Sequence, residues 1–150
     1  SRKFLEIGTG NGKIALHAAQ QGAEVTATDI NTEALEQLEQ KAEEKDLEVE
    51  TLESDLFEEV KGLYDVIVFN PPYLPGKEGI GDEEIWRGGD KGLEVTQRFL
   101  EDVEDFLTDE GIFIVVASSL AEYEELIEKF DLEVLDEKEL WFETLFILGK

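Results

Sequence analysis

The sequence predicts an α/β fold in which helices cover both faces of a mostly parallel sheet. Short apolar runs alternate with segments of helical periodicity along the chain. The first apolar run ends in a glycine-rich turn, and acidic residues follow the next two. Strands that alternate with helices form parallel sheets through right-handed crossovers. Neither a repeat nor an internal linker interrupts the alternation, so residues 1–150 are predicted to form one domain.

The first three elements are predicted from apolar spacing and glycines. Residues 3–7 are a short apolar run that leads into glycines, as expected of a buried strand. Residues 13–21 have helical spacing, and Gly22 stands where a glycine commonly ends a helix. Residues 23–28 alternate around Val25 and are predicted to be a second strand.

A long acidic helix and two further strands come next. The helix is predicted over residues 32–45, with Asn31 or Thr32 as its N-cap. Residues 47–52 are polar on one face, which is typical of an edge strand. Residues 64–69 are strongly apolar, which favours a central strand.

The remaining chain is predicted to hold a long loop, two helices and three strands. Residues 74–92 contain six glycines and a proline and are predicted to be a long loop, and loops of this length in compact domains are usually functional lids or disordered. A helix over 93–107, a strand over 111–117 and a helix over 120–130 follow. The tail has two strand-like runs, 132–135 and 140–148, that are close enough to pair antiparallel. The predicted sheet therefore has seven strands and a C-terminal antiparallel hairpin.

Composition excludes several classes of protein. The chain is 41% hydrophobic with nine Phe, which favours a packed core. The lack of cysteine excludes disulfides, thiolate metal sites and a cysteine nucleophile, and suits a cytoplasmic protein. His17 is the only histidine, so histidine-rich metal sites are excluded and no metal is expected. No window approaches the ~18 apolar residues of a membrane span.

The net charge of the chain limits which molecules it can bind. Thirteen basic residues against 38 acidic ones leave a net charge of −25. A field of that sign repels a phosphate backbone, so free nucleic acid is a poor partner unless a basic protein supplies the contact. A cationic cofactor or a basic protein is compatible with it. For most individual glutamates, a solvated helix face is the favoured interpretation.

The glycine-rich turn predicts a nucleoside site. Gly8, Gly10 and Gly12 follow the first strand and open a helix, where glycines permit a tight turn and close approach of a ligand. The G-x-G-x-G spacing differs from the G-x-G-x-x-G of dinucleotide enzymes. A phosphate-binding loop would need a hydroxyl after Lys13, but Ile14 stands there.

Two acids end the neighbouring strands. Asp29 lies about 20 residues after the glycines, the usual offset of an acid that binds ribose hydroxyls, or it caps the next helix. Asp55 can accept an adenine amino group while Leu56 packs against the ring, or it is an ordinary turn residue. Because ligands bind at the carboxyl ends of strands in such sheets, these groups are expected to share one crevice.

Asn70-Pro71-Pro72-Tyr73, directly after the fourth strand, indicates the chemistry. This run resembles the signature of amino-methyltransferases that act on a nitrogen bonded to an sp² carbon. Such a nitrogen is a poor nucleophile, and acceptors for both of its N–H bonds raise its electron density and orient it. The Asn70 side chain and the Pro71 carbonyl can be these acceptors, and Tyr73 offers an aromatic face. The alternative is a rigid Pro-Pro strand exit.

The whole chain is similar to the protein-glutamine methyltransferases of translation release factors, in their short archaeal and eukaryotic branch. The matching stretches are EIGTGNG, ATDIN, SDLF, NPPYLP and WRGGDKG. The resemblance implies a class I, Rossmann-like fold and the cofactor S-adenosyl-L-methionine (SAM). It implies that Asn70, Pro71 and Tyr73 are catalytic, and that SAM is held by Glu6, Gly8, Gly10, Gly12, Asp29, Ile30, Asp55, Leu56 and Asn70. Glu6 would contact the ammonium group of the methionine part.

The resemblance also implies a protein substrate and a small zinc-binding activator protein. The substrate would be a release factor, methylated on the glutamine of its Gly-Gly-Gln loop. The activator would dock at the edge of the third strand, near Leu47, Val49 and Leu52. Family members carry a leader segment that folds over SAM, whereas here Ser1 lies almost at the first strand.

Two other hypotheses remain at this point. The same tetrapeptide serves methylation of adenine, cytosine or guanine amino groups, against which the charge of −25 weighs. The missing leader and the lack of methionine suggest a truncated or redesigned SAM-binding scaffold without turnover.

Overall fold

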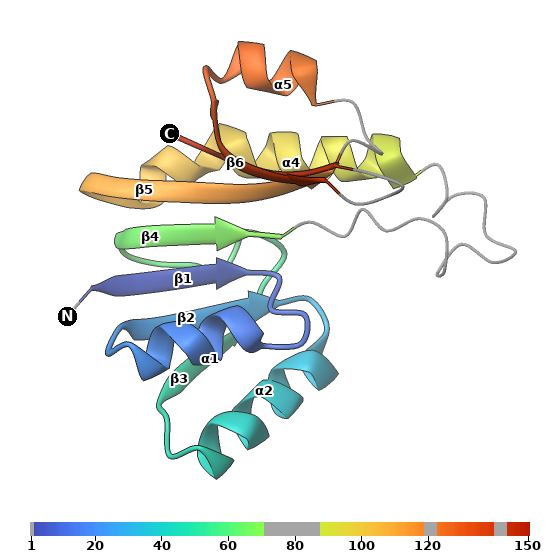
Figure 1. The fold of residues 1–150 in the computed structure, drawn as a ribbon. Helices are drawn as coiled ribbons and strands as arrows, with labels where there is room; N and C mark the ends of the chain where they lie inside the picture. Colours follow the sequence, from blue (N-terminus) through green and yellow to red (C-terminus); the bar gives the residue numbers. More distant parts are fainter. Residues whose placement is uncertain (1, 71–87, 119–122, 140–143) are drawn as a thin grey trace, which may run out of the picture. The chain divides into compact units, whose positions relative to one another are not determined.

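The computed structural model describes residues 2–70, 88–118, 123–139 and 144–150 (Figure 1). Seven strands form one sheet in the order β3-β2-β1-β4-β5-β7-β6. Its elements are β1 (Lys3–Ile7), α1 (Lys13–Gln20), β2 (Glu24–Asp29), α2 (Thr32–Glu44), β3 (Val49–Glu53), β4 (Tyr64–Phe69), α4 (Gly88–Asp102), the 3₁₀ helix η1 (Val103–Phe106), β5 (Leu107–Ser118), α5 (Glu124–Lys129), β6 (Glu133–Glu139) and β7 (Thr144–Gly149). The predicted seven-stranded α/β fold is confirmed.

The chain divides into two compact units, which are described separately. The first comprises Ser1–Phe69 and Asp102–Phe113, and the second comprises Asn70–Glu101 and Ile114–Lys150. The prediction of a single domain over residues 1–150 stays a prediction.

The first unit contains the parallel part of the sheet. β1 lies between β2 and β4, with Leu5 opposite Thr26 on one side and Ile67 on the other. β3 pairs in parallel with the far side of β2 and ends the strand order, as predicted for an edge strand. Parallel strands need helical crossovers, and α1 and α2 provide them beside β1–β3 (Figure 1). Their apolar faces bury a cluster against β2, formed by Ala15, Leu16, Ala18, Val25, Ala27, Leu38 and Ala42.

Local signals in this unit agree with the structure. The predicted strands 3–7 and 64–69 match β1 and β4. Gly22 follows α1 with a φ of 92°, the left-handed conformation in which glycine commonly ends a helix. Asn31, rather than Thr32, is the N-cap of α2, because its side chain accepts hydrogen bonds from the amides of Glu33 and Ala34.

The predicted strand 111–117 begins earlier than expected, at Leu107. The polar residues 108–110 lie between the predicted helix and the predicted strand, and tertiary contacts make them part of β5. The Thr108 hydroxyl donates to Asp65 Oδ1 at 3.0 Å, and the Lys3 amide donates to Asp65 Oδ2 at 2.8 Å. A Cβ on Gly111 would lie 2.9 Å from the carbonyl oxygen of Tyr64, so glycine allows the backbones to approach.

Helix α4, which belongs to the second unit up to Glu101, begins at Gly88 rather than at residue 93 and ends at Asp102. The predicted loop was therefore wrong for residues 88–92. Glycine costs about 1 kcal/mol relative to alanine in a helix, which is why the sequence favoured a loop. Packing outweighs this cost, because Thr96, Phe99 and Leu100 are all buried on the same helix. The end of the predicted helix, residues 103–107, is instead the 3₁₀ turn η1 and the start of β5.

The predicted C-terminal hairpin is confirmed in the second unit. β6 and β7 pair antiparallel, with an irregularity in register between Val134 and Asp136, and β7 also pairs antiparallel with the last part of β5. α5 occupies residues 124–129 of the predicted helix 120–130, whose first residues lie outside the described ones. Among the described residues, no helix is both long and apolar enough to span a membrane.

Helix α2 restricts which residues fit into the turn between β1 and α1, and two substitutions in that turn test this restriction. A Cβ on Gly12 would lie 2.8 Å from Leu38 Cδ1, and Leu38 is 1% exposed and has little room to move. A Cβ on Gly10 would meet nothing within 4 Å, although both glycines have positive φ. We expect Gly12→Ala to lower the free energy of unfolding by roughly 2–4 kcal/mol and Gly10→Ala by about 1–2 kcal/mol. Urea denaturation followed by circular dichroism measures both, and equal losses would show that the Leu38 contact is unimportant.

Candidate functional site

The glycine-rich turn leaves β1 and folds back over the end of β2. Gly8, Gly10 and Gly12 have φ values of 76°, 53° and 80°, which residues with a side chain rarely adopt. The predicted need for glycine at these positions is therefore confirmed. The amides of Gly8 and Thr9 both donate to the carbonyl oxygen of Thr28, at 2.9 and 3.1 Å.

Asp29 joins this turn to the exit of β2. Its Oδ2 accepts the Thr9 amide at 3.1 Å and its Oδ1 accepts the Asn31 amide at 2.9 Å. The alternative that Asp29 caps the next helix does not hold, because Asn31 caps α2. Each carboxylate oxygen has a second lone pair, so Asp29 retains acceptor capacity for ribose hydroxyls.

Helix α2 supports the turn from another direction. Lys41 Nζ donates to the carbonyl oxygen of Asn11 at 3.1 Å, and the Asn11 side chain accepts the Lys13 amide at 3.0 Å. Lys41 could not be identified from the sequence. It lies 30 positions from Asn11, and on a helix with many charged residues nothing marks it out from the others.

Asp55 and Leu56 form a strained turn after β3. Leu56 has a φ of 54°, unusual for a residue with a side chain, and is mostly buried. The Ser54 hydroxyl holds this conformation by donating to the Leu56 carbonyl at 2.9 Å and accepting the Glu59 amide at 3.0 Å. Asp55 is exposed. Ile30, at the exit of β2, is 70% exposed, which leaves an apolar side chain available for contact at this end of the strands.

Glu6 is a buried carboxyl at the end of β1. It is 2% exposed, and its Oε1 has no hydrogen-bond partner in the described part of the chain. Burial raises the pKa of Glu6 from 4.5 to about 8, and the charge of Asp29 adds to this effect. The nearby Thr9 side chain and the Ala15 amide lower the pKa by less. The carboxyl therefore lies close to the turn and to the start of α1, and it is mostly neutral at pH 7.

These residues fit a cationic nucleoside cofactor. SAM carries an ammonium group, ribose hydroxyls and an adenine ring. A buried carboxyl oxygen without a partner can accept a hydrogen bond from the ammonium, and the space beside Gly10 leaves the backbone open to a ligand. Within the described residues, no group of three or more His, Asp or Glu side chains is arranged to hold a metal ion.

The substrate side is described only at Asn70. This residue directly follows Phe69, the last residue of β4, which lies opposite Ile7 of β1. Asn70 is exposed. Pro71 and Tyr73, the other predicted catalytic residues, lie outside the described residues.

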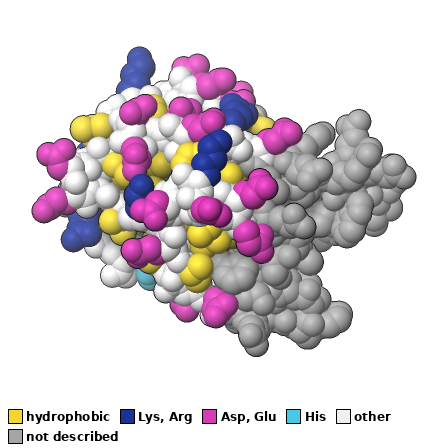
Figure 2. Space-filling model, turned by 90° about the horizontal axis from the view of Figure 1, so that it is seen from above, with side chains coloured by type: hydrophobic (Ala, Val, Ile, Leu, Met, Phe, Trp, Pro, Cys, Tyr) yellow, Lys and Arg dark blue, Asp and Glu magenta, His cyan; other side chains and the backbone are white. Residues whose placement is uncertain are grey.

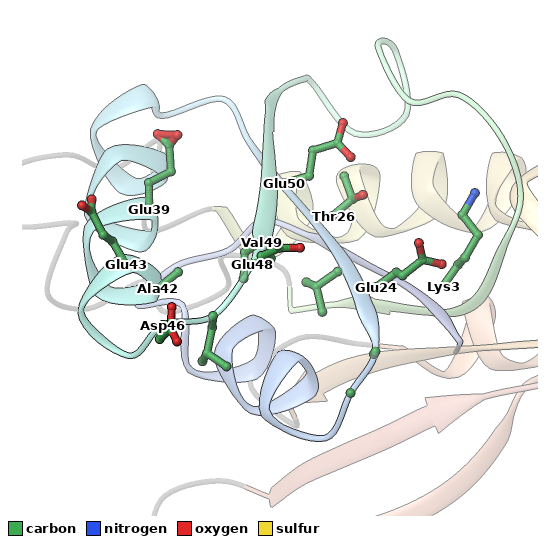
Figure 3. A pocket seen from close by; sticks show the side chains of 14 residues that line it. Lys3, Glu24, Thr26, Glu39, Ala42, Glu43, Asp46, Glu48, Val49 and Glu50 are labelled. Atoms are coloured by element: carbon green, nitrogen blue, oxygen red, sulfur yellow. The ribbon is translucent and has the colours of Figure 1, made fainter.

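A groove of about 950 Å³ opens at the other end of the strands (Figure 3). It adjoins Lys3, Glu24 and Val49, the first residues of β1, β2 and β3, and contains none of the predicted cofactor-binding residues. Its other charged lining residues are acidic, namely Glu39, Glu43, Asp46, Glu48 and Glu50. Figure 2 shows that Asp and Glu side chains are spread over the visible described surface, as expected of solvated helix faces.

The buried carboxyl predicts a pH dependence of stability. The folded state keeps the Glu6 proton up to about pH 8, whereas the unfolded state releases it near pH 4.5. Stability therefore falls as the pH rises through this window, by up to about 1.4 kcal/mol per pH unit. Glu6→Gln removes this part of the fall. Urea denaturation at pH 5, 6.5 and 8 measures it, and parallel curves for the two proteins would contradict the assignment.

Comparison with known sequences places the chain in a family. The family model described as "Methyltransferase small domain" matches residues 1–139. A putative protein N5-glutamine methyltransferase of Methanocaldococcus jannaschii is 35% identical over 99% of this chain and 81% of its own length. A release factor glutamine methyltransferase of Streptococcus pneumoniae is 36% identical over 71% of this chain, which spans only 42% of that protein. A ribosomal protein uL3 glutamine methyltransferase of Neisseria gonorrhoeae is 32% identical over 74% of this chain and 41% of its length.

Solved structures agree on the fold. The 16S rRNA N2 G1207 methyltransferase of Thermus thermophilus, in complex with AdoMet and guanosine, matches with a TM-score of 0.77 and 27% identity over 99% of this chain and 37% of that one. A ribosomal protein L11 methylase of Lactobacillus delbrueckii subsp. bulgaricus matches with a TM-score of 0.71 and 19% identity over 98% of this chain and 68% of that one. The chain belongs to the methyltransferase small-domain family and has the fold of class I SAM-dependent methyltransferases.

Proposed function

We propose that this protein uses SAM to methylate the side-chain amide nitrogen of a glutamine, in the Gly-Gly-Gln loop of a translation release factor. The observation that carries the proposal is the 35% identity to the putative protein N5-glutamine methyltransferase of M. jannaschii, which extends over 99% of this chain. The names of the S. pneumoniae and N. gonorrhoeae relatives support a glutamine in a protein of the translation machinery. The proposal places the reaction in the cytoplasm, where translation takes place.

The run Asn70-Pro71-Pro72-Tyr73 provides the substrate contacts in this proposal. The Asn70 side-chain oxygen and the Pro71 carbonyl accept the two N–H bonds of the glutamine amide. Both hydrogen bonds raise electron density on a nitrogen whose lone pair is otherwise delocalised, and they orient it for attack. Tyr73 packs on the planar amide. Bound SAM supplies an electrophilic methyl group.

The strand-end residues hold SAM in this proposal. The turn from Gly8 to Gly12 receives the methionine part, with Glu6 toward its ammonium. Asp29 accepts the ribose hydroxyls, with the exposed Ile30 beside them. Asp55 and Leu56 contact the adenine. The unpartnered oxygen of Glu6, the acceptor capacity of Asp29 and the 70% exposure of Ile30 support these roles.

We also propose that a small zinc-binding activator protein docks at the edge of β3. β3 ends the strand order, and Leu47 and Val49 are only partly buried against the core cluster. A partner that covers them would bury apolar surface that the unit leaves partly exposed.

Methylation of a nucleic-acid amino group is the second candidate. The 27% identity to the T. thermophilus rRNA guanine methyltransferase favours it. The net charge of −25 favours a protein acceptor, because a phosphate backbone would be repelled.

Methyl transfer from tritiated SAM to purified release factor, with the activator present, tests the proposal. Asn70→Ala should lower the transfer rate by about 100-fold or more, because one acceptor for the amide N–H bonds is lost. Its unfolding midpoint should stay unchanged, since Asn70 is exposed. Glu36→Ala, an exposed change on α2, is the matched control and should retain full activity.

Two outcomes would contradict the proposal. Unchanged activity of Asn70→Ala would remove Asn70 from the site. Transfer to ribosomal RNA but not to release factor would favour the second candidate.

A further inference from the structure

Glu6 carries a proton that the proposed function leaves without a role. Its carboxyl is 2% exposed at the end of β1, and its Oε1 has no hydrogen-bond partner among the described residues. The carboxyl lies near the Thr9 side chain, in the turn that contains Gly8, Gly10 and Gly12, and near the Ala15 amide of α1.

We propose that Glu6 releases its proton when the ammonium group of the cofactor binds, so that cofactor binding is coupled to the deprotonation of this one carboxyl. The inference rests on the proposed function only for the identity of the cofactor. It does not depend on which acceptor is methylated.

The surroundings of Glu6 explain why the proton is kept before binding. Opposite it, β2 places Ala27 and β4 places Val68, both apolar. Asp29, at the end of β2, acts on Glu6 with a charge of the same sign. The contact from α1 is the uncharged Ala15 amide. A buried carboxylate without a counter-charge is costly, so the neutral form persists.

Neighbouring basic side chains do not supply that counter-charge. Lys41, on α2, donates instead to the carbonyl oxygen of Asn11. Lys13 and His17, on α1, are exposed. None of these three is among the groups that shift the pKa of Glu6, which is raised to about 8. The cofactor ammonium would therefore supply the first positive charge at this carboxyl in the described part of the chain.

The coupling makes cofactor affinity depend on pH. Below the pKa of Glu6, the proton and the cofactor ammonium compete for the carboxylate. The association constant of the cofactor should therefore rise about tenfold between pH 6 and pH 7. The rise should level off near pH 8. The nucleoside part alone carries no ammonium, so its binding should leave the Glu6 proton in place.

Isothermal titration calorimetry in two buffers of different ionisation enthalpy counts the released protons. At pH 7, binding of SAM or S-adenosylhomocysteine should release about 0.9 proton from the wild type. Binding of 5′-methylthioadenosine, which has the nucleoside without the amino acid, should release none. Glu6→Gln should bind both kinds of ligand without proton release and without the tenfold pH dependence.

The outcomes separate this inference from the proposed function. SAM binding by the wild type without proton release, or with equal release by Glu6→Gln, overturns the coupling and leaves the methyltransferase proposal standing. Failure of the wild type to bind SAM at any pH overturns both. If Glu6→Gln does not fold, the wild-type comparison of SAM with 5′-methylthioadenosine still decides.

Discussion

The site depends on one constraint, the attachment of the first turn to the end of β2. The Thr28 carbonyl and the Asp29 carboxylate together accept three amide hydrogen bonds from Gly8 and Thr9. These bonds hold the backbone in a conformation that only glycine adopts readily at three alternate positions. Asp29 therefore holds the turn in place and still has lone pairs that can accept hydrogen bonds from a ligand. The buried Glu6 carboxyl lies near Thr9 of the same turn.

Burial determines the protonation state of Glu6. A carboxyl at an ordinary strand end would be solvated and charged, whereas this one is 2% exposed with a pKa raised to about 8. A neutral buried acid is tolerated because it removes the cost of an unpaired charge. The feature that would accept a cationic ligand is thus the same feature that destabilises the free protein as the pH rises.

Much of the fold was predictable, because apolar periodicity and glycines are local signals. The bounds of β1 and β4, the edge position of β3 and the terminal hairpin followed from them. The early starts of β5 and α4 did not. β5 extends through polar residues because Thr108 bonds to Asp65, 43 positions away, and α4 includes Gly88 because residues further along it are buried. Both depend on partners that a local pattern does not contain.

The site was predictable to a similar degree. The glycine positions and Asp29 could be read from spacing, whereas the burial of Glu6 and the bond from Lys41 to Asn11 arise only when distant elements pack. Helix α2 contacts the turn through Leu38 and Lys41, and its Glu39 and Glu43 line the groove at the opposite ends of the strands. The same helix thus contributes side chains both to the support of the glycine turn and to the lining of the groove. A substitution that shifted α2 in order to reshape the groove would also move the side chains that support the glycine turn, so the two regions are constrained to evolve together.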